Sequence, residues 1–383
     1  MAKEKELSLD KLLAKCSQSA HEIITAQKSL PVLSTGVFPL DLALGAIDPV
    51  RGNGGVRSRD MIEIMAMNGA GKTGIAYAAM AATMKRFPGT HKVVVAYFSE
   101  PPDEDQFIRM AVMGVDPERV AWIGLECNGN QALNQLLKIV GFEEIKLAVI
   151  DSIAAISVAA DEDKDLEDNA AVSGLALIYN RFAADFRDRS AYAPLIALNH
   201  YRLPISSGRP GQTAPPSVLD PSSKGGKTKD YLGKARIILS TVPKWEQDNK
   251  HSFAWNGSSK ATVIEEVNIK AKIPRNKYAP PMRECGFSYN TSTFKFNNEE
   301  ATIKLAATFA TKVGTEWKSL IDPGVFLSGA YYTIAGEKFQ GIGNAVSYLE
   351  GQPDLMEKIQ NQIIPYGKQF FMDQVNVEDE LDK

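Results

Sequence analysis

The sequence predicts an α/β fold in which a mainly parallel central sheet is flanked by helices. Short apolar runs alternate with helix-like or loop segments from about residue 58 onward, at residues 61–65, 93–98, 147–150, 194–198, 235–239 and 263–273. The first four runs are followed by segments of crossover length, and apolar strands joined by helices are typical of a parallel sheet buried on both faces. A glycine-rich turn follows the first run, and such turns between a strand and a helix are frequent in these sheets.

Smaller units are predicted on either side of this core, which we place at residues 36–295. Residues 1–35 are predicted to form an N-terminal unit, in which residues 1–30 are one amphipathic helix that Pro31 ends, with an apolar stripe made by Leu7, Leu9, Leu12 and Leu13. The stripe packs either on its own domain or on a neighbouring subunit, and the pattern alone leaves both open. Residues 296–367 predict a small α+β C-terminal domain and residues 368–383 an acidic tail, whose last residues, 375–383, are predicted to be unstructured.

The composition is that of an ordinary globular protein and excludes several classes. The 383 residues carry 43 Lys and Arg against 46 Asp and Glu, a net charge of −3, and 44% are hydrophobic. This balance excludes wholesale disorder and a uniformly basic nucleic-acid binder, so any DNA affinity must come from local patches. The three cysteines are far apart and no apolar run spans a bilayer, which predicts a soluble, cytoplasmic protein without a disulfide framework, zinc module or signal peptide.

The strongest chemical signal is a phosphate-binding loop directly after the first apolar run. A glycine-rich turn that opens a helix points backbone N–H groups at one place, where the helix dipole favours negative charge. A lysine there reaches the terminal phosphates, and the hydroxyl that follows it ligates Mg²⁺. The predicted ATP-binding residues are Asn68, Gly69, Ala70, Gly71, Lys72, Thr73 and Gly74. Ala66 stands where the pattern has glycine, and the alternative is a helix entry with a chance Lys-Thr pair.

Two carboxylates end later strands of the predicted sheet. Asp151 ends the run at 147–150, where parallel sheets bind ligands, and beside a phosphate loop it predicts a Mg²⁺ ligand together with Thr73. The alternative is that Asp151 caps the next helix. Glu100 ends the run at 93–98 and is a candidate general base that activates water, the alternative being a solvated carboxylate.

Six ordered segments resemble the RecA family of homologous recombinases, including its bacteriophage members. They are residues 32–45, 96–100, 114–120, 149–156, 198–200 and 329–349, of which the third and fifth look especially like the bacteriophage branch. The resemblance spans roughly residues 30–365 and implies a RecA-like P-loop ATPase core that uses ATP and Mg²⁺. It further implies a DNA-dependent ATPase that forms filaments on single-stranded DNA and catalyses homologous pairing and strand exchange, in recombination, repair and recombination-dependent replication.

The resemblance also implies roles for single residues. Glu100 matches the catalytic glutamate, and Phe107 matches an aromatic that stacks on adenine, although the spacing after it is two residues longer here. His200 occupies the position that senses the γ-phosphate; a histidine satisfied at a strand end is the alternative. Arg275 and Lys277 match basic residues that reach a neighbouring subunit's ATP, the alternative being a solvated strand end.

Residues 160–172 and 203–228 fall where the family has its two DNA-binding loops. The first is strongly acidic, which fits DNA contact poorly. The second is rich in glycine and basic residues, a composition suited to sequence-independent contact with phosphates, and a simple flexible surface loop is the alternative. The predicted DNA-binding residues are Arg202, Arg209, Lys224, Gly225, Gly226 and Lys227. Asp230 departs from the family, which has a lysine there that couples the subunit interface to activity.

The expected partners are single-stranded and duplex DNA and further copies of the chain in a helical filament, with no membrane. The N-terminal helix would pack on the adjacent copy, and the C-terminal domain would gather duplex DNA. The acidic tail would compete with DNA for basic surface or bind a loader or single-strand-binding protein, in the cytoplasm of a bacterium or of a phage's host. A ring-forming helicase of the same fold and a non-catalytic ATP-binding scaffold are the rival functions.

Overall fold

The computed structural model describes residue 25 and residues 29–67, 69–124, 129–156, 174–200, 233–241, 250–255, 259–264, 266–314 and 316–372. Most of the predicted N-terminal helix, both predicted DNA-binding loops and the tail from residue 373 lie outside these ranges. Within them, no helix combines the length and apolar character that crossing a bilayer requires.

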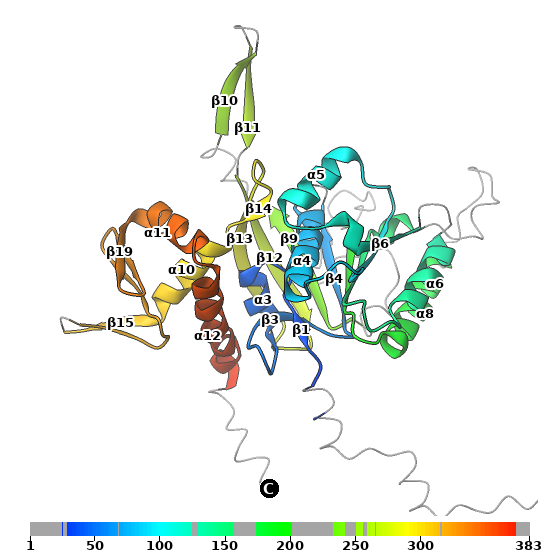
Figure 1. Cartoon of the computed structure of the whole chain (residues 1–383), viewed down its shortest axis with the longest axis horizontal. Helices are drawn as coiled ribbons and strands as arrows, with labels where there is room; N and C mark the ends of the chain where they lie inside the picture. The colour runs from blue at the N-terminus through cyan, green and yellow to red at the C-terminus, as the bar shows by residue number, and fades with distance from the viewer. Residues whose placement is uncertain are drawn as a thin grey trace, which may run out of the picture.

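A nine-stranded sheet forms the centre of the described structure, in the order β14-β13-β12-β9-β4-β8-β7-β5-β6 (Figure 1). Its parallel part consists of β4 (Met61–Ala66), β5 (Val94–Phe98), β6 (Val120–Ile123), β7 (Leu147–Asp151), β8 (Leu195–His200) and β9 (Ala235–Thr241). The remaining strands run antiparallel along one edge and are β12 (Glu266–Asn276), β13 (Arg283–Asn290) and β14 (Lys295–Phe296). The predicted α/β class with a mainly parallel sheet is therefore confirmed.

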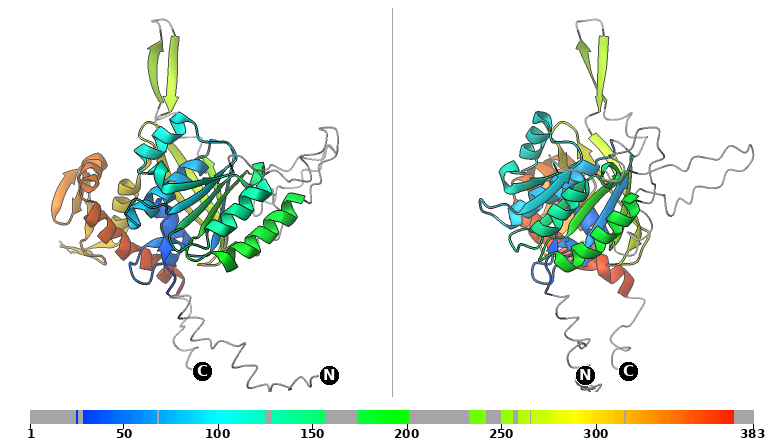
Figure 2. Two further views of the ribbon diagram at one scale, coloured as in Figure 1. Left: turned by 45° about the vertical axis from the view of Figure 1, so that its right-hand side comes forward. Right: turned by 90° about the vertical axis from the view of Figure 1, so that its right-hand side faces the viewer.

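Helices cover both faces of this sheet, because its strands are apolar on both sides (Figure 2). Along β5, Val94, Ala96 and Phe98 belong to one apolar cluster, and Val95 and Tyr97 belong to another. The first cluster includes residues of α3 (Phe38–Leu44), α4 (Lys72–Arg86) and α5 (Glu104–Val112). The second includes residues of α6 (Gly129–Ile139) and α8 (Gly174–Arg189). Short 3-10 helices follow α5 and β7, at η1 (Pro117–Arg119) and η2 (Ile153–Ala155).

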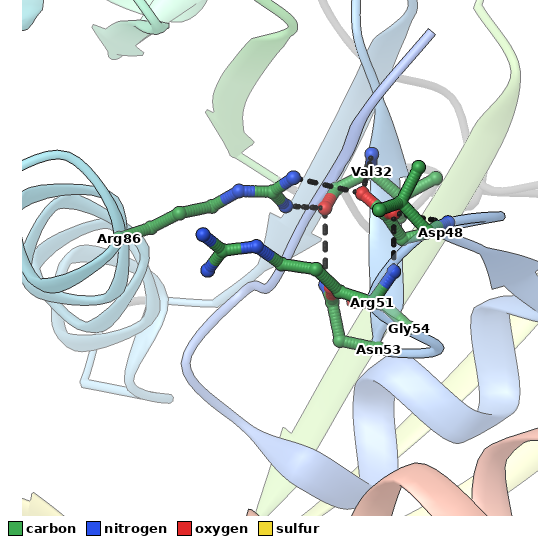
Figure 3. A network of polar contacts seen from close by, with 7 residues as sticks. Val32, Asp48, Arg51, Asn53, Gly54 and Arg86 are labelled. Atoms are coloured by element: carbon green, nitrogen blue, oxygen red, sulfur yellow. Dashed lines mark hydrogen bonds and ion pairs between the residues drawn. The ribbon is translucent and has the colours of Figure 1, made fainter. Parts of the chain in front are cut away.

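A three-stranded sheet precedes β4 and is tied to α4 by a charged network (Figure 3). It consists of β1 (Val32–Leu33), β2 (Ala46–Ile47) and β3 (Gly54–Arg57). Arg86, in the last turn of α4, donates to Asp48 Oδ2 at 2.8 Å and to the carbonyl of Val32. Asp48 also accepts backbone N–H groups of Val32, Val50 and Arg51, each at 2.9 Å. These bonds orient α4, whose opposite end forms the candidate site.

The C-terminal part has an apolar cluster of its own, built mostly from residues beyond 300 and joined by Phe38 of α3. It comprises α10 (Asn298–Thr308), β15 (Ala310–Val313), β16 (Glu316–Ser319), β17 (Val325–Ser328), β18 (Tyr331–Ile334), β19 (Glu337–Gln340), α11 (Gly341–Glu350) and α12 (Pro353–Met372). Asn298 joins this part to the core, since it accepts the Phe38 N–H at 2.9 Å and donates to the Gly36 carbonyl at 2.8 Å. The boundaries between the predicted domains stay a prediction.

The predicted strand at residues 263–273 is divided between two elements. Residues up to Ile264 belong to β11 (Ser259–Ile264), which pairs with β10 (Lys250–Trp255) in a hairpin that projects from the body of the molecule (Figures 1 and 2). Residues from Glu266 onward form β12 in the central sheet. The single apolar run predicted at residues 263–273 therefore includes the end of the projecting β10–β11 hairpin and part of β12 in the central sheet.

Candidate nucleotide-binding site

The loop between β4 and α4 has the backbone geometry of a phosphate cradle. Gly69 and Gly71 have φ angles of 79° and 81°, in the left-handed region that favours glycine. A Cβ on Gly71 would also lie only 2.8 Å from Ile269 Cδ1, so β12 holds this turn from one side. Gly71 is the N-cap of α4 and offers no side chain to cap it, which leaves the first N–H groups of the helix for an anion.

Lys72 lies folded back over this loop. Its side chain is buried, and Nζ donates to the carbonyls of Ala66 and Met67 at 3.1 and 3.0 Å. Burial lowers the pKa of Lys72, and the nearby negative charge of Asp151 opposes that shift. The ammonium therefore stands at the mouth of the cradle, in place to exchange carbonyl oxygens for phosphate oxygens.

Thr73 and Asp151 meet across the cradle, and Thr73 Oγ1 donates to Asp151 Oδ2 at 2.8 Å. Burial raises the pKa of Asp151; the Thr73 hydrogen bond and the charges of Lys72 and His200 lower it, and Glu100 raises it further. A hydroxyl and a carboxylate are hard oxygen ligands of the kind that Mg²⁺ takes beside phosphates and water. The donor set fits the predicted metal, and no group of three or more His, Cys, Asp and Glu that could form a protein-only metal site occurs among the described residues.

Glu100 and His200 lie at the same edge of the sheet, at the ends of the two strands that flank β7. Glu100 follows β5 and is exposed, while Ser99 beside it donates its N–H to the Asp151 carbonyl at 2.7 Å. His200 ends β8 and is paired in register with Ala66, the last residue before the cradle. The structure thus brings Lys72, Thr73, Asp151, Glu100 and His200 to one edge, although they come from widely separated segments.

Phe107 lies on α5, the helix that follows Glu100. Its half-buried ring meets Trp122 of β6 edge-on, with centroids 5.8 Å apart, and Trp122 in turn packs on Phe98 at 5.5 Å. On the same helix, the Arg109 guanidinium lies 5.2 Å from the Phe294 ring centroid. The adenine-stacking role of Phe107 remains a prediction.

Arg275 and Lys277 lie at the opposite end of the sheet from the cradle. Arg275 of β12 pairs with Arg236 at the start of β9, whose first residues are in register with the start of β4. Through Arg236, Arg275 is level with Glu63, three residues before the end of β4, so it lies roughly 10 Å short of the cradle along the strand direction. The pKa of Lys277 is lowered by burial and by the charges of Lys234, Arg187 and Arg275. The charge of Asp60 opposes this shift. The structure does not bring these two residues to the cradle of their own chain.

The sequence pattern did not single out a buried polar network beside this site. Glu63 of β4 accepts a hydrogen bond from Asn199 Nδ2 at 2.7 Å on Oε1 and from Arg236 Nε at 3.0 Å on Oε2. A lone carboxylate inside the apolar run at 61–65 indicates that Glu63 has partners, because a buried charge requires them, but the sequence does not identify those partners. Asn68 and the predicted DNA-binding residues lie outside the described part of the chain.

The structure is an α/β fold with a glycine-rich loop between β4 and α4, and the comparisons with known proteins show what the chain is similar to. The model of the RecA N-terminal domain matches residues 9–182. "Protein RecA" of Synechocystis sp. is 25% identical over 342 residues, which cover 88% of this chain and 82% of that protein. "Protein RecA" of Leptospira meyeri is 25% identical over 362 residues, covering 92% and 79%. The chain is thus similar to RecA proteins along most of its length, and its residues 9–182 match the RecA N-terminal domain.

Proposed function

We propose that this protein is an ATP-dependent recombinase that forms helical filaments on single-stranded DNA and catalyses homologous pairing and strand exchange. Its similarity to RecA proteins supports the general assignment to recombination and repair. The finer assignment rests on the arrangement of the charged residues around the sheet.

One observation carries the proposal: the cradle and the pair Arg275 and Lys277 occupy opposite ends of the sheet. A nucleotide held by Lys72 therefore receives these cations only from another copy of the chain. A contact between two different surfaces of identical chains is head-to-tail, and it generates an open helix when the rotation does not close. This geometry supports a filament with nucleotide at each joint.

The residues at the cradle suit phosphoryl transfer to water. Lys72 and the N–H groups of α4 would hold the β- and γ-phosphates, and Thr73 and Asp151 would hold Mg²⁺, which neutralises the developing charge when bound. Glu100 is exposed beside this cluster, where its carboxylate can take a proton from the attacking water. Arg275 of the adjacent copy would stabilise the transferring charge as an arginine finger does.

DNA would bind through the basic, glycine-rich residues 203–228, which follow His200 in the sequence. His200 ends β8 in register with Ala66, next to the cradle, where a bound γ-phosphate would act on it. We propose that this is how a bound γ-phosphate changes the grip on DNA. Contacts made mostly to phosphates predict binding without sequence preference and with steep salt dependence.

The experiment mixes two inactive variants. Lys72→Ala lacks the cradle cation, and Arg275→Ala/Lys277→Ala lacks the cations of the opposite edge. Each alone should hydrolyse little ATP with single-stranded DNA, whereas random equimolar mixing restores roughly a quarter of the joints and a corresponding share of the hydrolysis. No recovery on mixing would contradict a shared site, and unchanged hydrolysis in the double variant would exclude a role for Arg275 and Lys277.

A further inference from the structure

Three neighbouring strands of the central sheet are joined by one carboxylate. Glu63 lies in β4, the strand that leads into the cradle, and its two oxygens bind different neighbours. Oε1 accepts Asn199 Nδ2 of β8 at 2.7 Å, and Oε2 accepts Arg236 Nε of β9 at 3.0 Å. All three residues are buried. A buried network whose contacts are satisfied holds its members in one arrangement.

On one side, this network reaches the nucleotide sensor. Asn199 Oδ1 accepts the backbone N–H of His200 at 2.9 Å, so the same amide group binds both Glu63 and His200. His200 is in register with Ala66, at the entrance to the cradle. A shift of His200 toward or away from a γ-phosphate therefore moves the amide that Glu63 holds.

On the other side, the network reaches the edge that faces the next copy. Arg236 pairs directly with Arg275 across β9 and β12, and residues opposite each other in an antiparallel pair share a face of the sheet. Lys277 is fixed to the same strand by its N–H, which donates to the Lys234 carbonyl at 2.8 Å. The sheet is thus crossed by four residues in turn, namely Asn199, Glu63, Arg236 and Arg275. They lead from the chain's own cradle to the cations proposed to contact the nucleotide of the adjacent copy.

We propose that Glu63 is a positioning residue that couples the nucleotide in a chain's own cradle to the cations it presents to its neighbour. This inference rests on the proposed function, because it requires a nucleotide at each joint. Without the network each cradle would still bind nucleotide. The bound nucleotide would, however, no longer change the position of the cations at the adjacent joint or the affinity for DNA.

The test uses two variants that cut the network on different sides without leaving a buried charge unpaired. Asn199→Leu removes the contact to β8 and keeps the Glu63–Arg236 ion pair. The double variant Glu63→Gln/Arg236→Met removes the contact to β9 and the two opposite charges together. Thr302→Val is the matched control: Thr302 is fully buried in α10, donates to the Asn298 carbonyl at 2.7 Å and accepts Gln360 Nε2 at 2.8 Å, away from the network.

The measurement is the ratio of the Kd for single-stranded DNA in ADP to that in a slowly hydrolysed ATP analogue, followed by fluorescence anisotropy on the full chain. We expect a ratio on the order of tenfold or more for the unmodified protein and for Thr302→Val, within the usual range of such couplings. Both network variants should give a ratio within about twofold of one, while the Kd for the nucleotide itself changes by less than about threefold.

A simple structural role predicts a different result. If Glu63 only stabilises the fold, Thr302→Val should lower the ratio as much as the network variants, and that outcome overturns the inference. Network variants that keep the full ratio, or that lose nucleotide binding itself, overturn it as well. An unmodified protein whose DNA affinity is the same in both nucleotides would instead refute the proposed function, which this experiment therefore tests separately.

Discussion

Thr73 Oγ1 and Asp151 Oδ2 lie 2.8 Å apart, joined by a hydrogen bond between residues that are 78 positions apart in the chain. The contact ties the first turn of α4 to the end of β7, on the two sides of the phosphate cradle. It brings a hydroxyl and a carboxylate oxygen to one point, and we propose that both are ligands of Mg²⁺ there. The sheet brings them together, since parallel strands end at the same edge.

Replacing Lys72 by alanine should abolish nucleotide-dependent function. The ammonium is the buried cation at the cradle, and losing a buried charge-assisted contact lowers affinity on the order of 100-fold or more. Lys85→Ala is the matched control, because Lys85 is an exposed lysine at the other end of the same helix. ATP affinity, measured by calorimetry, should fall in the first variant only; wild-type hydrolysis in Lys72→Ala would refute the phosphate-loop assignment.

Replacing Glu100 by glutamine should separate binding from turnover. The amide cannot accept the proton of an attacking water, so the rate of hydrolysis should fall by about 10² to 10⁴-fold while ATP and DNA still bind. Glu118→Gln changes another exposed carboxylate and should leave the rate as it is. Steady-state hydrolysis and anisotropy with labelled DNA measure the two properties, and retained turnover in Glu100→Gln would remove Glu100 from the mechanism.

The Asp41 carboxyl should make stability depend on pH in a defined direction. Asp41 is a buried residue of α3, and burial raises its pKa to about 7, against the hydrogen bonds from Ser34 and Thr35. The folded state therefore holds its proton at pH values where the unfolded chain has lost it. The contribution of Asp41 to the free energy of unfolding is at its maximum below about pH 4. It decreases as the pH rises toward 7, by up to about 1.4 kcal/mol per pH unit.

Urea unfolding of Asp41→Asn and of the unmodified protein at pH 5 and pH 7 measures this effect. Asparagine does not titrate, so the variant should lose less stability between the two pH values than the unmodified protein. An equal loss in both proteins would show that Asp41 is ionised in the folded state throughout this range.

Replacing Arg86 by methionine should destabilise the fold without touching the cradle directly. The substitution leaves the carboxylate of Asp48 buried with its three backbone donors but no cation (Figure 3). Breaking a buried pair costs about 3–5 kcal/mol, and the remaining donors reduce this to about 2–3 kcal/mol. Arg51→Met is the control: its exposed side chain should contribute less than about 0.5 kcal/mol. Similar unfolding free energies for both variants would contradict the role of Arg86.

The parallel strands could be predicted from the sequence because each is buried on both faces and is therefore continuously apolar. The run at 61–65 became β4, and the run at 147–150 became β7. The edge strand β6 was not predicted, since its central residues Ala121 and Trp122 are only half-buried and its four residues give a weak pattern. The boundary between β11 and β12 was also missed, because apolar periodicity does not reveal where a strand leaves its sheet.

The cradle could be predicted because its chemistry depends on consecutive residues. Lys72 and Thr73 follow a glycine-rich turn, and local backbone geometry decides their placement. The network of Glu63, Asn199 and Arg236 could not, because its members meet only through the lateral order of β8, β4 and β9. Strand order is a tertiary property, and no spacing in the chain encodes it.

Electron microscopy of the protein on single-stranded DNA tests the central claim most directly, with a slowly hydrolysed ATP analogue in one sample and ADP in the other. The account predicts an extended helical filament with the analogue, in which Arg275 and Lys277 of one copy face the nucleotide held by Lys72 of the next. Closed rings, monomers, or a filament whose nucleotide contacts only the chain that holds it would contradict the account.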